Sequence, residues 1–125
     1  MKRILINLSG HPAPRGAEEA FDKVVSVPVP TVDLARKEAL AEAAQSLVSQ
    51  ALEDAEVKEA LLRGEAAVIL PGSSALAGTV LAVLEGVSGT LPELRWAVRD
   101  KGVYLLSEGL DLATQRVAGR ALRRD

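Results

Sequence analysis

Short runs of apolar, often β-branched residues alternate along the chain with longer stretches in which apolar residues recur every three or four positions. The short runs are bounded by Gly, Pro, Ser or Asp, a combination that predicts strands. Five segments have this character: Arg3–Leu8, Lys23–Val29, Glu65–Leu70, Leu94–Arg99 and Val103–Ser107. The turn at Asp100–Gly102 joins the last two segments and predicts a hairpin.

The longer stretches have the spacing of helices. They are a short turn at Glu18–Phe21, an amphipathic segment over Leu34–Leu52, a second piece that ends at Gly64, Ala75–Glu85 and Asp111–Arg124. Thr31 or Asp33 is placed to cap the amphipathic helix, and the acidic cluster Glu53–Glu56 is expected to interrupt it or to start the next one. Ala75–Glu85 is apolar almost all round, so we expect neighbours to cover most of its sides.

Strands and helices in mostly alternating order predict an α/β protein. The expected architecture is a Rossmann-like three-layer sandwich with a mostly parallel central sheet of about five strands and a C-terminal hairpin, built as one domain over residues 1–125. No run approaches about 20 apolar residues, and the first residues lack the apolar region of a signal peptide. We therefore expect a cytoplasmic protein with no membrane partner.

Composition narrows the chemistry. With 48% hydrophobic and 26% charged residues, the chain is not a disordered segment. It has no cysteine and one histidine, so we expect no metal site, no thiol nucleophile and no bound cofactor. A net charge of −2 argues against duplex nucleic acid as a partner, and a single Trp, Tyr and Phe give no set of aromatic side chains for stacking single-stranded bases.

Two predicted strand exits carry polar groups suited to a ligand. Asn7, Ser9, Gly10 and His11 follow the first strand, and Gly72-Ser73-Ser74 opens the apolar helix. In open α/β sheets, ligands bind outside the carboxyl ends of the strands, and the free N–H groups of a helix start form an anion site. Ser73 or Ser74 could add a hydroxyl donor to a phosphate.

Each feature also has a purely structural interpretation. The serines after Gly72 make a good helix N-cap, and His11 suits a turn. The acidic side chains on the central helices are expected to be solvated. The chain lacks a P-loop, a Gly-x-Gly-x-x-Gly fingerprint and a Gly-x-Ser-x-Gly elbow, which argues against the enzyme classes that use them.

Longer stretches of the chain resemble one small CRISPR-associated family, the single-domain, CARF-like family numbered fifteen in the Csx series. The similar stretches are Leu70–Ala77, continuing through Val80–Gly86 to Leu91–Arg95, together with Leu5–Pro12 as the opening strand and loop and Val27–Val29 in the second strand. The resemblance runs over most of the chain in order, in short stretches. Gly10, which precedes His11-Pro12, departs from the tighter loop of the family.

The resemblance implies a specific function. CARF-type domains are Rossmann-like, pair as homodimers and bind cyclic oligoadenylates across the two-fold axis. These second messengers, most often cyclic tetra-adenylate, are made by type III CRISPR complexes during antiviral defence. Relatives pass the signal to an effector domain, cleave the ring or hold it out of circulation, and for this chain we expect no attached effector.

The expected primary activity is therefore sequestration of the ring at a homodimer interface. Slow cleavage of the ring is compatible with it as a second activity. Two alternatives stay open: a metal-independent ring nuclease that cuts through the 2′-OH, and an α/β module for another phosphorylated metabolite. The expected ligand-binding residues are Asn7, Ser9, Gly10, His11, Gly72, Ser73, Ser74 and Arg95. Asn7 would read adenine, and His11 or Arg15 would assist the leaving oxygen in any cleavage.

Overall fold

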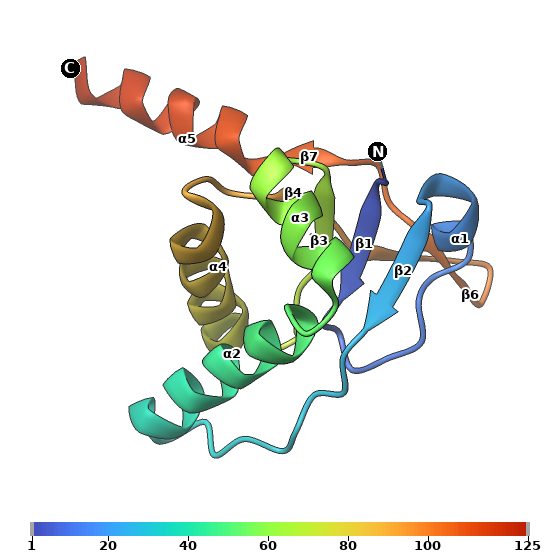
Figure 1. Cartoon of the computed structure of the whole chain (residues 1–125), viewed down its shortest axis with the longest axis horizontal. Helices are drawn as coiled ribbons and strands as arrows, with labels where there is room; N and C mark the ends of the chain where they lie inside the picture. Colours follow the sequence, from blue (N-terminus) through green and yellow to red (C-terminus); the bar gives the residue numbers. More distant parts are fainter. Residues whose placement is uncertain (1, 125) are drawn as a thin grey trace.

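The structure, a computed structural model, describes residues 2–124 and has a Rossmann-like three-layer α/β fold with a C-terminal hairpin (Figure 1). Its central sheet has five strands in the order β2-β1-β3-β4-β7. The first four of these are parallel and the edge strand β7 is antiparallel to β4. Their bounds are β1 (Ile4–Asn7), β2 (Lys23–Ser26), β3 (Ala66–Ile69), β4 (Glu93–Arg95) and β7 (Leu110–Asp111).

The helices α2 (Lys37–Ala51), α3 (Ala55–Arg63) and α4 (Ser74–Ser88) cover one face of the sheet (Figure 1). The other face is covered by the single turn α1 (Ala17–Ala20) and by the hairpin of β5 (Ala97–Asp100) and β6 (Val103–Leu106). The helix α5 (Leu112–Ala121) projects from the body and ends in a 3₁₀ turn, η1 (Leu122–Arg124). Within residues 2–124, no helix has the length and apolar character needed to cross a membrane.

The core lies on both sides of β1, whose four residues are all buried. Successive side chains of a strand point to opposite faces, so Ile4 and Ile6 pack beneath the helices while Leu5 packs beneath α1 and the hairpin. The four residues of β3 are buried as well. This two-sided burial explains why both strands are continuous apolar runs, as expected in a parallel sheet with both faces covered.

Two predicted boundaries were wrong between the second strand and the next helix. β2 ends at Ser26 rather than Val29, because the prolines that follow have no N–H to give to a neighbouring strand. α2 starts at Lys37, and Asp33 instead organises a turn, in which its Oδ1 accepts a hydrogen bond from the backbone N–H of Ala35 at 3.0 Å. A cap signal marks a bend as readily as a helix start.

The predicted strand Leu94–Arg99 is divided at Trp96. Its first half is β4 in the central sheet, its second half is β5 in the hairpin, and the fifth strand of the central sheet is β7. Ser107 holds the division: its Oγ accepts from Trp96 N, and its own N donates to Trp96 O, both at 2.9 Å. The chain therefore leaves the sheet at this point.

Two predictions were confirmed: a new helix starts at the acidic cluster Glu53–Glu56, and that helix ends at Gly64. Asp54 Oδ1 accepts from Glu56 N at 2.9 Å at the start of α3, and Gly64 ends that helix with φ at +72°. A left-handed φ is the conformation that favours glycine at a helix C-terminus. Within the described chain, α4 buries Leu76, Val80 and Leu84 in the core, and its opposite side is exposed.

Candidate functional site

The order of the central strands defines where a ligand is expected to bind. From β1 the chain goes outward to β2 on one side, and it later returns to β3 on the other side of β1. The point between β1 and β3 is therefore a topological switch point, where the loops diverge and leave a crevice. Leu8 N donates to Ile69 O at 2.9 Å, which extends the pairing of β1 with β3 by one residue before the loops diverge.

A cavity of about 450 Å³ opens at this edge of the sheet. The loop that follows β1 forms one wall, and the β5–β6 hairpin forms the opposite wall. Its lining residues are Ser9, His11, Pro12, Ala13, Pro14, Ile69, Ala97 and Tyr104. Of the residues proposed from the sequence, Ser9 and His11 thus face a shared cavity.

Asn7, the last residue of β1, is buried at the base of that loop, with only 1% of its surface exposed. Its Nδ2 donates to His11 O at 2.8 Å and to Ser26 Oγ at 3.2 Å. Its Oδ1 accepts from the backbone N of Ser9 at 3.2 Å and from the hydroxyl of Ser9 at 2.7 Å. These bonds use the full capacity of the amide, so Asn7 acts on a ligand through the loop that it holds.

Gly10 and His11 form the exposed tip of the loop. Gly10 has φ at +80°, and a Cβ there would lie 3.4 Å from the side chain of Val29, so both backbone and space favour glycine. The imidazole of His11 is exposed and has no hydrogen-bond partner among residues 2–124. It is therefore available to a ligand in the cavity.

Gly72, Ser73 and Ser74 lie at the end of the neighbouring strand β3, outside the lining of the cavity. Ser73 is the N-cap of α4, and its Oγ accepts from Leu76 N at 3.4 Å. Gly72 and Ser74 are exposed. Because a helix leaves its first N–H groups without helical partners, this start of α4 offers further donors to an anion at the same edge of the sheet.

The two arginines singled out from the sequence have structural partners instead of a place in the cavity. Arg95 Nε contacts Glu93 Oε2 at 2.8 Å, and its Nη1 donates to Ser107 O at 2.9 Å. Its guanidinium also lies 5.1 Å from the centre of the Phe21 ring. The backbone of Arg15 pairs with the hairpin, donating to Tyr104 O at 2.9 Å, while its exposed side chain borders a neighbouring hollow.

Sequence analysis missed the hairpin wall, above all Ala97 and Tyr104. Both lie far from the loop after β1 in the sequence, and no local motif marks them. The contact depends on a parallel bridge between Arg15 and Leu105, which fastens the hairpin beside the loop. Only the folded chain brings the wall and the loop together.

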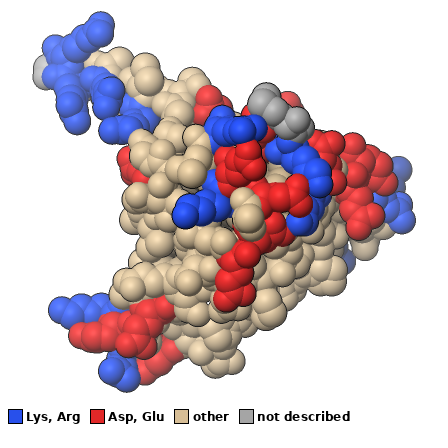
Figure 2. Space-filling view, in the orientation of Figure 1, with Lys and Arg blue, Asp and Glu red and all other residues tan. Residues whose placement is uncertain are grey.

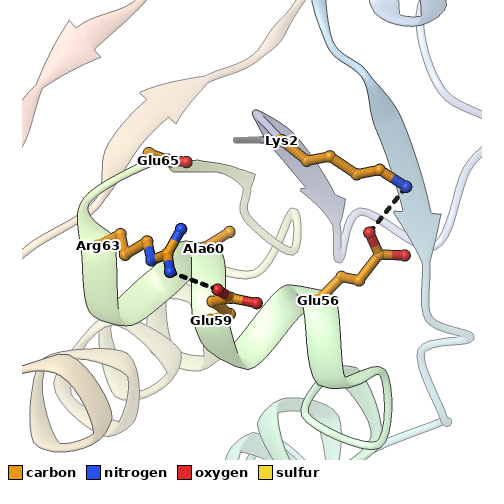
Figure 3. Close-up of a pocket in the computed structure, with 6 residues that line it drawn as sticks. All are labelled: Lys2, Glu56, Glu59, Ala60, Arg63 and Glu65. Atoms are coloured by element: carbon orange, nitrogen blue, oxygen red, sulfur yellow. Dashed lines mark ion pairs between the residues drawn. The ribbon is translucent and has the colours of Figure 1, made fainter.

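A second hollow, of about 250 Å³, lies at the opposite edge of the sheet, where β1 and β3 begin (Figure 3). Charged side chains dominate its lining, and four of the five form ion pairs with one another. Lys2 contacts Glu56 at 2.8 Å and Arg63 contacts Glu59 at 2.7 Å. This hollow therefore carries its own counter-charges, and across residues 2–124 no group of three potential metal ligands occurs.

The topology and the cavity together define an α/β protein with a cavity at the β1/β3 switch point. No protein-family model, no curated protein and no solved structure matches this chain. The assignment of a ligand therefore rests on the chemistry of the site and on the resemblance noted in the sequence.

Proposed function

We propose that this protein is a homodimer that binds a cyclic oligoadenylate, in particular cyclic tetra-adenylate, and lowers its free concentration during a type III CRISPR response. The observation that carries the proposal is that the loop after β1 and the turn before α4 follow the carboxyl ends of two adjacent parallel strands, β1 and β3, at the switch point. The cavity would take an adenine, and the N–H groups at the start of α4 would take a phosphate. A symmetric ring suits a two-fold symmetric pair of such sites.

The outer surface of α4 supports the proposed pairing of two chains. The outer side of α4 is a row of small exposed residues, Ala75, Gly78, Ala82 and Gly86. Figure 2 shows a largely uncharged surface over α4, hollowed between the basic tip of α5 and the charged start of α2. Small residues allow close approach of a second helix. Because α4 begins at the proposed phosphate site, pairing of two chains along α4 would place two such phosphate sites in one dimer.

The chemistry of the cavity favours retention of the ring over rapid cleavage. Among residues 2–124, His11 is the only imidazole in the lining of the cavity, and the lining contains no carboxylate that could pair with it in acid–base chemistry. Incubation with labelled cyclic tetra-adenylate in EDTA separates the two activities. A retained complex without linear products supports sequestration, whereas linear products identify a metal-independent ring nuclease.

A charge substitution at Ser73 tests the placement of the phosphate. Ser73→Asp keeps a good N-cap but puts a negative charge at the start of α4, and Ser73→Asn is the matched neutral cap. We expect the affinity of Ser73→Asp for cyclic tetra-adenylate, measured by calorimetry, to be at least about tenfold below that of Ser73→Asn. Equal affinities of the two variants would contradict the placement.

The alternative ligand is another phosphorylated metabolite, for which the same site has suitable donors. Thermal unfolding with cyclic tetra-adenylate, ATP and AMP, each at the same concentration, distinguishes the candidates. A ligand that binds the folded state raises the melting temperature, and at equal concentration the increase grows with the logarithm of its affinity. Stabilisation by ATP as strong as that by the ring would remove the support for a symmetric site.

A further inference from the structure

We infer that the 450 Å³ cavity is a nucleobase pocket in which Tyr104 supplies the stacking surface and therefore sets the preference for a base over a bare sugar phosphate. The identity of the complete ligand rests on the proposed function above. The base pocket itself rests on the walls of the cavity.

The walls have the chemistry of a pocket for a planar, largely apolar group. Pro12, Pro14, Ile69 and Ala97 offer carbon surface, while Ser9 and His11 bring polar atoms to one side only. Small-molecule sites of about 300–1,000 Å³ combine apolar walls with a few polar groups in this way. A nucleobase fits that division, since its faces are apolar and its edges form hydrogen bonds.

Tyr104 is free to receive such a group. The residue is 56% exposed, and neither its ring nor its hydroxyl has a hydrogen-bond or cation–π partner among residues 2–124. The fold holds it by its backbone, because Arg15 N donates to Tyr104 O at 2.9 Å. A large exposed ring on a fixed backbone is a suitable platform for an aromatic ligand.

A cation lies next to this platform. Arg99 is directly opposite Tyr104 in the antiparallel hairpin, so the two side chains project from the same face. Arg99 is exposed and has no ion pair within residues 2–124. It can therefore meet the phosphate of a nucleotide whose base lies on Tyr104.

Hydrogen bonds within the chain hold both walls of the cavity. Asn7 holds the loop on one side through His11 O at 2.8 Å. On the other side, Leu106 N donates to Arg15 O at 2.9 Å, and Ser107 joins the base of the hairpin to Trp96. Binding into fixed walls avoids the entropy cost of ordering a loop.

The test compares AMP with ribose 5-phosphate, which has the same phosphate and sugar but no base. Affinities are measured by NMR titration of the wild type, Tyr104→Leu and Tyr104→Phe, with the amide signals of Ala97 and Tyr104 as local reporters. We expect the wild type to prefer AMP, Tyr104→Leu to lose that preference at least about fivefold, and Tyr104→Phe to keep most of it. The affinity for ribose 5-phosphate should stay within about twofold in all three.

The outcomes separate this inference from the proposed function. A wild type that binds cyclic tetra-adenylate while Tyr104→Leu keeps its preference for AMP overturns the base pocket and leaves the proposed function standing. A wild type that prefers AMP through Tyr104 but does not bind the ring supports the pocket and removes the proposed messenger. No preference for AMP in the wild type overturns the inference outright.

Discussion

The side chain of Asn7 links the core of the sheet to the loop that lines the cavity. It is buried at the end of β1, and its amide satisfies four hydrogen bonds to the residues around it. A buried amide with all its partners defines one loop conformation, because any other would leave a polar atom unpaired. The shape of the cavity therefore depends on a residue that does not line it.

Replacing Asn7 should weaken both the fold and the site. We expect Asn7→Ala to lower the free energy of unfolding by about 1–3 kcal/mol, since Ser9 N and His11 O lose buried partners. Urea unfolding measures the change. Ser26→Ala is the control, because it removes only the 3.2 Å bond to the exposed Ser26 and should cost less than about 1 kcal/mol. Equal losses in the two variants would show that Asn7 does not organise the loop.

Residue types and strand exits were predictable from the sequence, but the partners of the side chains were not. The polar cluster after the first strand marked the loop that carries Ser9 and His11. Arg95 and Asn7 were expected to reach a ligand, and in the fold they contact Ser107 and His11 respectively. Which partner a polar side chain finds depends on elements distant in the sequence, so composition at a strand end cannot specify it.

At the scale of elements, a cluster of ion pairs fastens the start of the edge strand β2 to the start of α3. Lys23 of β2 is paired with Asp54, the N-cap of α3, and with Glu56 at 3.1 Å. Asp54 and then Glu56 raise the pKa of Lys23, and Lys23 in turn lowers the pKa of Asp54. The pKa of Glu56 is lowered first by Lys2 and then by Lys23.

These shifts give the stability a pH dependence of known sign. The lowered carboxyl pKa values mean that the contribution of the cluster is present above the ordinary range of about pH 4 and is lost as the pH falls through and below it. The raised pKa of Lys23 means that the contribution is also lost as the pH rises beyond about 10.5. Between these limits the contribution should be constant.

The variant Lys23→Met tests the cluster. It removes the charge but keeps the length of the side chain along β2, so its urea midpoint should fall less steeply than that of the wild type between about pH 5 and pH 3. At high ionic strength the two curves should converge, because exposed ion pairs are screened. Parallel curves at all salt concentrations would contradict a role for Lys23 in the acid response.

Local signals predicted the elements well wherever one residue decides the backbone. The caps at Asp54 and Ser73 and the left-handed Gly64 act within one helical turn, so the sequence around them was sufficient. Trp96 has no such signal. Its division of the strand depends on Ser107, and the short edge strand β7 depends on pairing with β4, so both required the tertiary fold.

At the scale of the whole molecule, much of the C-terminal part of the chain lies outside the core. α5 has no buried residue, and Val117 and Leu122 are 63% and 76% exposed. Beside it, the outer side of α4 bears small residues and a single charge, Glu85, which contacts Arg116 of α5 at 3.6 Å. Exposed apolar side chains of this size along one helix are typical of a surface that contacts a partner.

The variant Ala82→Glu asks whether that partner is a second copy. Ala82 is exposed at the middle of the outer side of α4, so a carboxylate there is harmless in a monomer but has no counter-charge in an interface between two α4 helices. We expect sedimentation to give the mass of two chains for the wild type and of one chain for Ala82→Glu, with the affinity for cyclic tetra-adenylate reduced by at least about tenfold. Ala20→Glu introduces the same charge at an exposed position of α1 and should remain a dimer. If Ala82→Glu is still a dimer, the contact between the two chains lies elsewhere. Pairing along α4 would then no longer bring together the two proposed phosphate sites, which lie at the start of that helix at Ser73.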